Sequence, residues 1–199
     1  MVQHPHNELS ITATSTVRTS RPVPPPAETT APWETVVLRL AAHEQPGEFE
    51  AFQFVFASPL ISLHPAAIEY AQKSFAPGTP VLAGTADLVR RIFTEFSYDK
   101  NASTVDTTVD QVLEKKRGVC QDQTHVLLTL AREQRIPARY VAGYLLTDAE
   151  GLSHDASHAW AELFIEDLGW VGFDPTNACC PDDRYIRIGS GLDAQEAAL

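Results

Sequence analysis

A cysteine at position 120 lies where a loop leads into an apolar-striped segment, in the stretch RGVCQDQTHVLLTLA. Cysteine attacks carbonyl groups as a thiolate, and the free N–H groups and dipole at a helix N-terminus stabilise that anion. Gly118 lets the backbone turn sharply into the helix and leaves room for a substrate. Free cysteines are also among the most frequently buried residues. Position alone therefore leaves open whether Cys120 is a nucleophile or a structural thiol.

A histidine that could activate this thiol occurs at position 158, in the alternating segment SHAWAELFIEDLGWVGFDPT. An imidazole can accept a proton from a thiol and later deliver it to a leaving amine. The chain has seven histidines, so His158 by itself could equally be a surface or packed residue. His125 lies five residues after Cys120 and points elsewhere on a helix, which favours a structural role.

A carboxylate at position 174 ends the same segment and precedes a proline. Asp-Pro is also a common turn starter. The turn residues 167–169 predict a β-hairpin with strands at 158–166 and 169–174. In an antiparallel pair the start of the first strand lies beside the end of the second, which brings Asp174 next to His158. The carboxylate would hold one ring nitrogen and fix the tautomer of the imidazole.

The elements around these residues predict an α+β fold in which helices come first and an antiparallel sheet follows. Apolar periodicity and capping residues predict a series of helices, and a β-branched and aromatic run predicts a strand before the hairpin. The predicted helices are 64–75, 85–99, 107–118 and 120–134, and the predicted strand is 136–147.

The N-terminal part has a different composition. Its first residues are rich in Thr, Ser and Pro, and they contain too few apolar side chains to build a core, which predicts disorder. The proline run 22–26 predicts extended chain that is either a plain tail or a docking ligand. Segments 33–42 and 48–57 are expected to be strands. The predicted organisation is a disordered tail, a short β-rich region and a catalytic domain at residues 1–32, 33–60 and 61–195.

Composition limits the class of protein. The chain has 199 residues, 44% of them hydrophobic, as expected for one globular domain. Its net charge of −11 argues against nucleic acid or an anionic membrane as a partner. The N-terminus lacks an apolar signal segment, and no run approaches the roughly 18 apolar residues of a membrane helix. We therefore expect a cytoplasmic protein.

The cysteine and histidine spacing predicts no disulfide framework and no metal. Cys179 and Cys180 are adjacent, and with Cys120 they make an odd set of three. His154 and Asp155 precede His158 in a set that resembles metal ligands, but this stretch is expected to be a loop that leads into a strand. We expect no cofactor.

Four blocks resemble the transglutaminase-like superfamily, in particular its bacterial cysteine-hydrolase branch: GVCQDQTH, ARYVAGYL, SHAWAELFIEDLGWVGFDPTN and DDRYIRIGSG. The resemblance covers residues 85–193 and implies a papain-like core with a Cys-His-Asp triad. By match, Cys120 is the nucleophile, His158 the base and Asp174 the orienting acid. Members of the superfamily cleave or transfer amides through a thioester, which implies a peptide or protein substrate.

Other residues near the triad have open roles. Gln121 and Asp122 are candidates for supporting or oxyanion-hole residues, and the backbone N–H of the nucleophile is an expected oxyanion donor. Tyr98, in FSYD, matches a family position and is a candidate for the site or for core packing. The chain departs from the family pattern at Gln123-Thr124, beside the nucleophile. The departures leave open an alternative function, a catalytically weak module that binds a partner.

Overall fold

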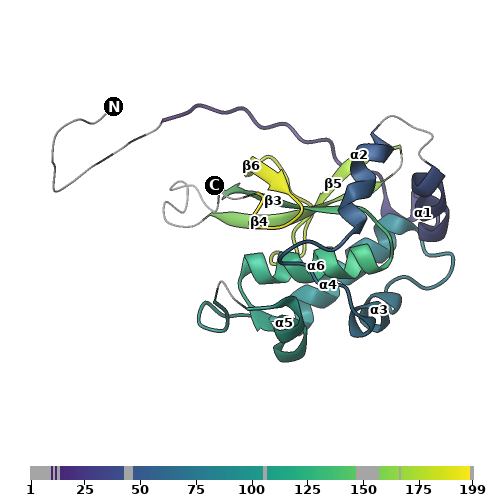
Figure 1. Ribbon diagram of the computed structural model, residues 1–199. Helices are drawn as coiled ribbons and strands as arrows, with labels where there is room; N and C mark the ends of the chain where they lie inside the picture. Colours follow the sequence, from purple (N-terminus) through teal and green to yellow (C-terminus); the bar gives the residue numbers. More distant parts are fainter. Residues whose placement is uncertain are drawn as a thin grey trace.

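The computed structural model of the protein describes residues 10, 12, 14–42, 47–104, 107–146, 157–165 and 167–197. Helices pack against one face of a four-stranded antiparallel sheet with the strand order β5-β4-β3-β6 (Figure 1). The predicted α+β class is therefore confirmed. Within the described residues, no helix combines the length and the hydrophobicity needed to cross a membrane. The helices are Trp33–Ala42 (α1), Glu48–Phe52 (α2), Pro65–Gln72 (α3), Val81–Glu95 (α4), Val109–Lys115 (α5) and Cys120–Glu133 (α6). The strands of the sheet are Ala138–Leu145 (β3), His158–Ile165 (β4), Gly169–Phe173 (β5) and Tyr185–Gly191 (β6).

Helix α6 is the central element of the core. Its predicted apolar face is fully buried, and it packs against α3, α5 and the inner face of β3 and β4 (Figure 1). Each leucine that is fully buried in this way contributes about 1.5–3 kcal/mol of transfer free energy. The helix is therefore a rigid support, and its first residue is Cys120.

The predicted hairpin is present as β4 and β5. The two strands pair in antiparallel register from Ile165 opposite Gly169 to Ala161 opposite Phe173. Asp167 and Gly169 have φ angles of 63° and 69°, which is the left-handed geometry that a tight turn requires. The last pair brings the chain that follows β5 back toward the start of β4.

The two strands that we predicted at 33–42 and 48–57 are wrong, because both segments are helical. In α1 the buried side chains are Val36 and Leu40, four residues apart, which is the spacing of one helical face. The second segment forms α2 and then a short 3-10 helix, Gln53–Val55. Their β-branched and aromatic side chains favour strands only weakly, and packing against the rest of the core overrides that preference.

The described part of the N-terminal region follows a defined path. Residues 14–26 contain no helix or strand, but from residue 19 onward they contact the outer face of the sheet, the face opposite α6 (Figure 1). A 3-10 turn at Ala27–Thr29 then leads toward α1. The predicted disorder therefore does not describe residues 19–25. Residues 1–9, 11 and 13 of the predicted tail lie outside the described residues.

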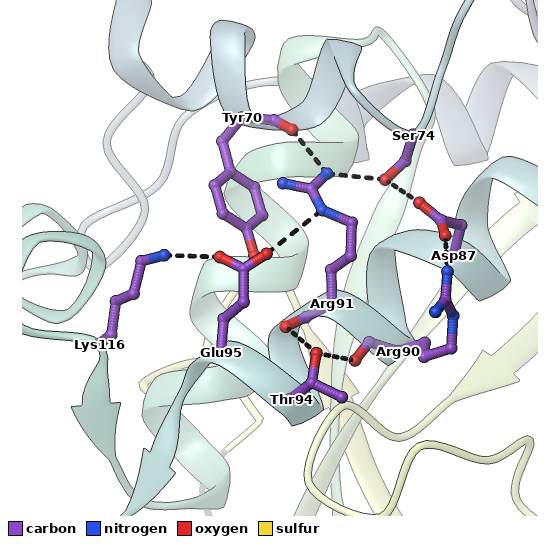
Figure 2. Close-up of polar contacts among 8 residues, drawn as sticks. All are labelled: Tyr70, Ser74, Asp87, Arg90, Arg91, Thr94, Glu95 and Lys116. Atoms are coloured by element: carbon purple, nitrogen blue, oxygen red, sulfur yellow. Dashed lines mark hydrogen bonds and ion pairs between the residues drawn. The ribbon is translucent and has the colours of Figure 1, made fainter.

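A polar cluster joins α3 and α4 to the segment that precedes α6 (Figure 2). Arg91 donates hydrogen bonds to the carbonyl oxygen of Tyr70 (2.9 Å) and to the hydroxyl of Ser74 (2.8 Å). One turn further along α4, Glu95 accepts a hydrogen bond from Lys116, the C-cap residue that follows α5. The end of α4 and the end of α5 are therefore held together.

This link brings two short strands into register beside the start of α6. Strand β1 (Ser97–Tyr98) pairs in parallel with β2 (Arg117–Gly118), and Tyr98 lies opposite Gly118. Tyr98 is therefore held next to the turn that leads into Cys120.

Candidate active site

The first turn of α6 presents Cys120 at its N-terminus. Val119 precedes the helix with extended backbone (φ −102°, ψ −178°), and its N–H donates to Oδ2 of Asp122 at 2.7 Å. The same carboxylate accepts a hydrogen bond from the hydroxyl of Ser103. Asp122 therefore caps the helix and, as an acceptor, does not supply an oxyanion donor. The cap leaves Cys120, which is partly exposed, at the positive end of the helix dipole.

Gly118 makes this cap possible. A Cβ atom at position 118 would lie 2.6 Å from both Cβ and Oδ2 of Asp122. Such distances are well below van der Waals contact, so a larger residue would displace the carboxylate. The glycine therefore provides room for the capping side chain, which is a different reason from the sharp turn that we inferred from the sequence.

His158 and Asp174 form a direct pair beside the helix end. His158 is the first residue of β4, and Asp174 follows β5, as the hairpin predicts. The Nε2 atom of His158 lies 2.7 Å from Oδ2 of Asp174, which is fully buried. An ionised carboxylate only accepts hydrogen bonds, so Nε2 carries the proton. In the neutral imidazole, Nδ1 is then a free acceptor for a thiol proton.

Asp174 is held by several donors besides His158. The backbone N–H groups of Thr176 and Asn177 donate to Oδ1 at 2.8 and 3.2 Å. The Asn177 amide and the Tyr185 hydroxyl both donate to Oδ2 at 2.7 Å. Burial raises the pKa of Asp174, but hydrogen bonds from His158, Asn177 and Tyr185 lower it more, and the net shift is downward. The carboxylate is therefore ionised and fixed in orientation.

The environment of His158 favours the imidazolium. Burial lowers its pKa, but hydrogen bonds to Asp174 and Cys120, and the charges of these groups, raise it to about 9. Cys120 and His158 line the same cleft, and their mutual interaction contributes to this shift. The three predicted triad residues are thus brought together from the end of a helix, the start of one strand and the end of another.

A cleft of about 610 Å³ opens in front of Cys120 and His158. Tyr98 and Gln121 both line it, so these two candidates lie at the site, whereas Asp122 lies behind it. Sequence reasoning missed Tyr140 and Lys100, which also line the cleft. Small side chains form much of the remaining wall: Ala142, Ala159, Ala194 and Ala197.

His125 has a structural role, in agreement with the sequence interpretation. Its Nε2 accepts a hydrogen bond from the backbone N–H of Ala194 at 3.2 Å, and its ring packs against Tyr140. Burial lowers the pKa of His125 to about 4, so the ring is neutral at pH 7 and can accept this bond. It thereby holds one wall of the cleft.

Two residues that sequence reasoning missed complete the surroundings of Asp174. Tyr185 and Asn177 both lie in blocks that carry the family resemblance, and Asn177 follows Asp174 by three residues. Nothing in the local pattern shows that Tyr185, eleven positions away, returns to the same carboxylate. That contact exists because the sheet is assembled in the order β5-β4-β3-β6, in which β6 pairs with the edge of β3 that faces away from β4.

Cys179 belongs to the same surroundings, and Cys180 does not. The backbones of Cys179 and Asp174 form an isolated β-bridge, and the Cys179 thiol lies 3.3 Å from the Tyr185 hydroxyl. Burial raises the pKa of Cys179, which disfavours its thiolate. All three cysteines are free. The predicted ligand-like residues His154 and Asp155 lie outside the described residues, and the described residues contain no group of three metal-binding side chains.

Comparison with known proteins identifies the family. Residues 68–175, more than half of the chain, match the transglutaminase-like superfamily. The chain belongs to the transglutaminase-like superfamily. This transglutaminase-like chain is 37% identical, over 96% of its length, to uncharacterized proteins of Mycobacterium tuberculosis and Mycobacterium bovis. It spans 63% of the length of those relatives.

Other relatives of the transglutaminase-like chain carry functional descriptions. A protein-glutamine gamma-glutamyltransferase of Pseudomonas aeruginosa is 30% identical over 53% of this chain and 17% of its own. The crystal structure of a candidate cysteine protease from Cytophaga hutchinsonii superposes with a TM-score of 0.67 at 25% identity, over 79% of this chain and 51% of that protein. The periplasmic domain of TgpA from Pseudomonas aeruginosa superposes with a TM-score of 0.52 at 28% identity, over 64% of this chain and 49% of that one.

Proposed function

We propose that this protein is a cysteine-dependent amide hydrolase or acyl transferase that acts on peptide or isopeptide bonds through a thioester. The observation that carries the proposal is the 2.7 Å contact between His158 and the buried Asp174, beside a cysteine at a helix N-terminus. Burying a carboxylate is costly unless it is paired and hydrogen-bonded, and five donors hold Asp174 ionised beside the imidazole. Membership of the superfamily supports the same assignment.

In the proposed reaction, the Cys120 thiolate attacks the carbonyl carbon of the amide. A new S–C bond forms, and the negative charge of the tetrahedral intermediate collapses to break the C–N bond. The imidazolium of His158 donates its proton to the leaving nitrogen, and Asp174 keeps the ring in place. Water or a second amine then attacks the thioester, gives its proton to His158 and releases the thiolate.

The cleft supplies candidates for stabilising the oxyanion. The backbone N–H of Cys120, in the first turn of α6, needs a partner outside the helix. The side chains of Gln121 and Tyr98 line the same cleft and carry N–H and O–H donors. These are the roles that we assign to the two residues.

The charges around the cleft suggest which substrates it accepts. Among the described residues that line it, Lys100 and His158 are the titratable cations, and the described lining contains no carboxylate. The lining thus differs from the chain as a whole, which has a net charge of −11. Because of the cations in the lining, we expect a preference for substrates that carry a carboxylate near the scissile amide, by charge complementarity.

Acylation of Cys120 by a p-nitrophenyl ester tests the proposal. Intact-protein and peptide mass spectrometry should show one acyl group on Cys120 and release of nitrophenol in a burst. Hydrolysis and transfer are then distinguished by adding an amine such as glycinamide and measuring how much acyl group it captures. Cys120→Ala should abolish the burst, and Cys180→Ala is the matched control because that thiol is exposed and outside the pair.

A native protein whose Cys120 is acylated no faster than Cys179 and Cys180 would refute the enzyme assignment. The alternative, a module that binds a partner without catalysis, would then be favoured by a stoichiometric complex with that partner. A burst that survives in Cys120→Ala would refute the assigned nucleophile while leaving some catalytic activity to be explained.

A further inference from the structure

The segment from Thr19 to Pro25, here called the strap, is fastened to the turn that precedes β6. The hydroxyl of Thr19 donates to the carbonyl oxygen of Asp183 at 2.6 Å. The backbone N–H of Arg21 donates to Oδ1 of the same residue at 3.0 Å. More than 160 positions separate the bonded residues, so the strap closes over the sheet from the other end of the chain (Figure 1).

The side chain of Arg21 extends from the strap onto the outer face of the sheet. Its Nη2 donates to the carbonyl oxygen of Tyr185 at 3.4 Å, and its Nη1 lies 3.8 Å from Oε1 of Glu162. The guanidinium carbon lies 5.7 Å from the centre of the Trp160 ring, within cation–π distance. The Glu162 side chain is only 5% exposed, and Arg139 and Arg187 contact its Oε2 at 2.6 and 3.2 Å, so Arg21 is one of three cations around this buried carboxylate.

The residues under Arg21 are the ones that pack around the catalytic pair. Trp160 and Tyr185 are fully buried and contact each other edge to face, with ring centres 5.4 Å apart. Both rings also flank His158, at 6.2 and 5.8 Å between ring centres. Tyr185 is therefore held at its carbonyl by Arg21 and donates from its hydroxyl to Asp174.

From this chain of contacts we propose that the strap sets the geometry of the His158–Asp174 pair, with Arg21 as a positioning residue that acts through Tyr185 and Trp160. The inference rests on the proposed function. The physical reason is that the Tyr185–Asp174 hydrogen bond depends on where the first residue of β6 lies. The strap holds that residue by its carbonyl and through the preceding Asp183. The strap also covers Trp160, whose ring limits the movement of the imidazole.

The test compares Arg21→Ala with Arg18→Ala in the full chain. Arg18 is exposed and three residues earlier, so it controls for the loss of one positive charge. The second-order rate of Cys120 alkylation by iodoacetamide is measured from pH 5 to 10 by peptide mass spectrometry, and thermal unfolding is recorded for each variant. We expect Arg21→Ala to lower the rate at pH 7 by roughly threefold to tenfold, and to move the rise of the rate with pH to higher pH, because a weaker pair with His158 stabilises the thiolate less. Arg18→Ala should match the native protein.

Two further variants keep the test decisive if Arg21→Ala unfolds. Thr19→Val removes one hydrogen bond to Asp183 with little change in volume, and Arg21→Lys keeps the charge but loses the planar fork. Both should move the rise of the rate with pH in the same direction by a smaller amount. A lower melting temperature with an unchanged pH profile would show a purely structural strap and would overturn the proposal.

His158→Ala separates this inference from the proposed function. If His158→Ala alkylates at the native rate, the thiol–imidazole pair does not operate and the proposed function fails. If that variant loses the enhanced rate while Arg21→Ala behaves like Arg18→Ala, the catalytic pair stands and only the role of the strap is refuted.

Discussion

Replacing Asp174 by asparagine removes the charge that keeps His158 protonated while leaving the side-chain shape almost unchanged. The pKa of His158 is about 9 in the protein and 6.5 for the free side chain, a difference worth about 3 kcal/mol in favour of the imidazolium. The pair with Asp174 opposes the burial that lowers this pKa. Without the carboxylate, burial is opposed only by Cys120, so we expect the pKa of His158 to fall well below 9.

The size of the effect follows from the two protonation states. At pH 8 a group with a pKa of about 9 is nine-tenths protonated, whereas one with a pKa of 6.5 is protonated to only a few per cent. A fall of the His158 pKa to 6.5 would reduce the imidazolium population at pH 8 by about thirtyfold. The rate of Cys120 alkylation and the acylation burst should also fall, but by less, because an ordinary thiol is partly ionised at pH 8 without an imidazolium partner.

The assay is the pH profile of Cys120 alkylation, together with the NMR titration of the His158 ring. Asp182→Asn is the matched control, because Asp182 is an exposed acid that pairs with Arg184 outside the site. In the native protein and the control, the His158 ring should titrate near pH 9. An Asp174→Asn variant whose His158 still titrates near pH 9 would refute the assignment of Asp174 as the group that sustains the imidazolium.

The raised pKa of His158 also makes stability depend on pH: the stabilisation is fully present below pH 6.5 and is lost as the pH rises through about 9. Urea denaturation should show native stability falling across that window, and His158→Gln should lack the fall. Gly118→Ala places a Cβ atom 2.6 Å from the Asp122 carboxylate and should cost about 1–3 kcal/mol in the same experiment; an unchanged midpoint would contradict the cap. Lys100→Glu should raise KM for a substrate with an adjacent glutamate and lower it for one with an adjacent lysine, whereas the distant Lys73→Glu should change neither. Equal KM values for both substrates in all variants would remove Lys100 as a specificity determinant.

The parts of the fold that sequence predicted correctly depend on local patterns. The apolar spacing after Gly118 predicts helix α6. Helix α5 begins with a threonine cap, since the Thr108 hydroxyl accepts a hydrogen bond from the backbone N–H of Gln111. The alternation of apolar and polar residues on both sides of the turn at 167–169 predicts the hairpin. The errors at α1 and α2 arose where aromatic and β-branched side chains matched both periods, and tertiary packing selected the helix.

The triad followed from sequence because two of its members lie on one hairpin. Antiparallel pairing alone places His158 beside Asp174 once the turn is located. Cys120 was assigned by its place at a helix start and by resemblance to the family. No local rule joins that helix end to the hairpin, and the contact is made because α6 packs against the inner face of β4.

The sequence by itself therefore determined helices α3 to α6, strand β3, the β4–β5 hairpin, the resemblance to the family and the identity of the three candidate catalytic residues. Only the tertiary structure decided that Asp122 caps α6, that Tyr185 and Asn177 hold Asp174, and that Arg21 covers the sheet behind His158. The physical reason is distance along the chain. Periodicity and turn chemistry act over a few residues, whereas the contact of Arg21 with Tyr185 spans 164 positions and forms only when the whole sheet is assembled.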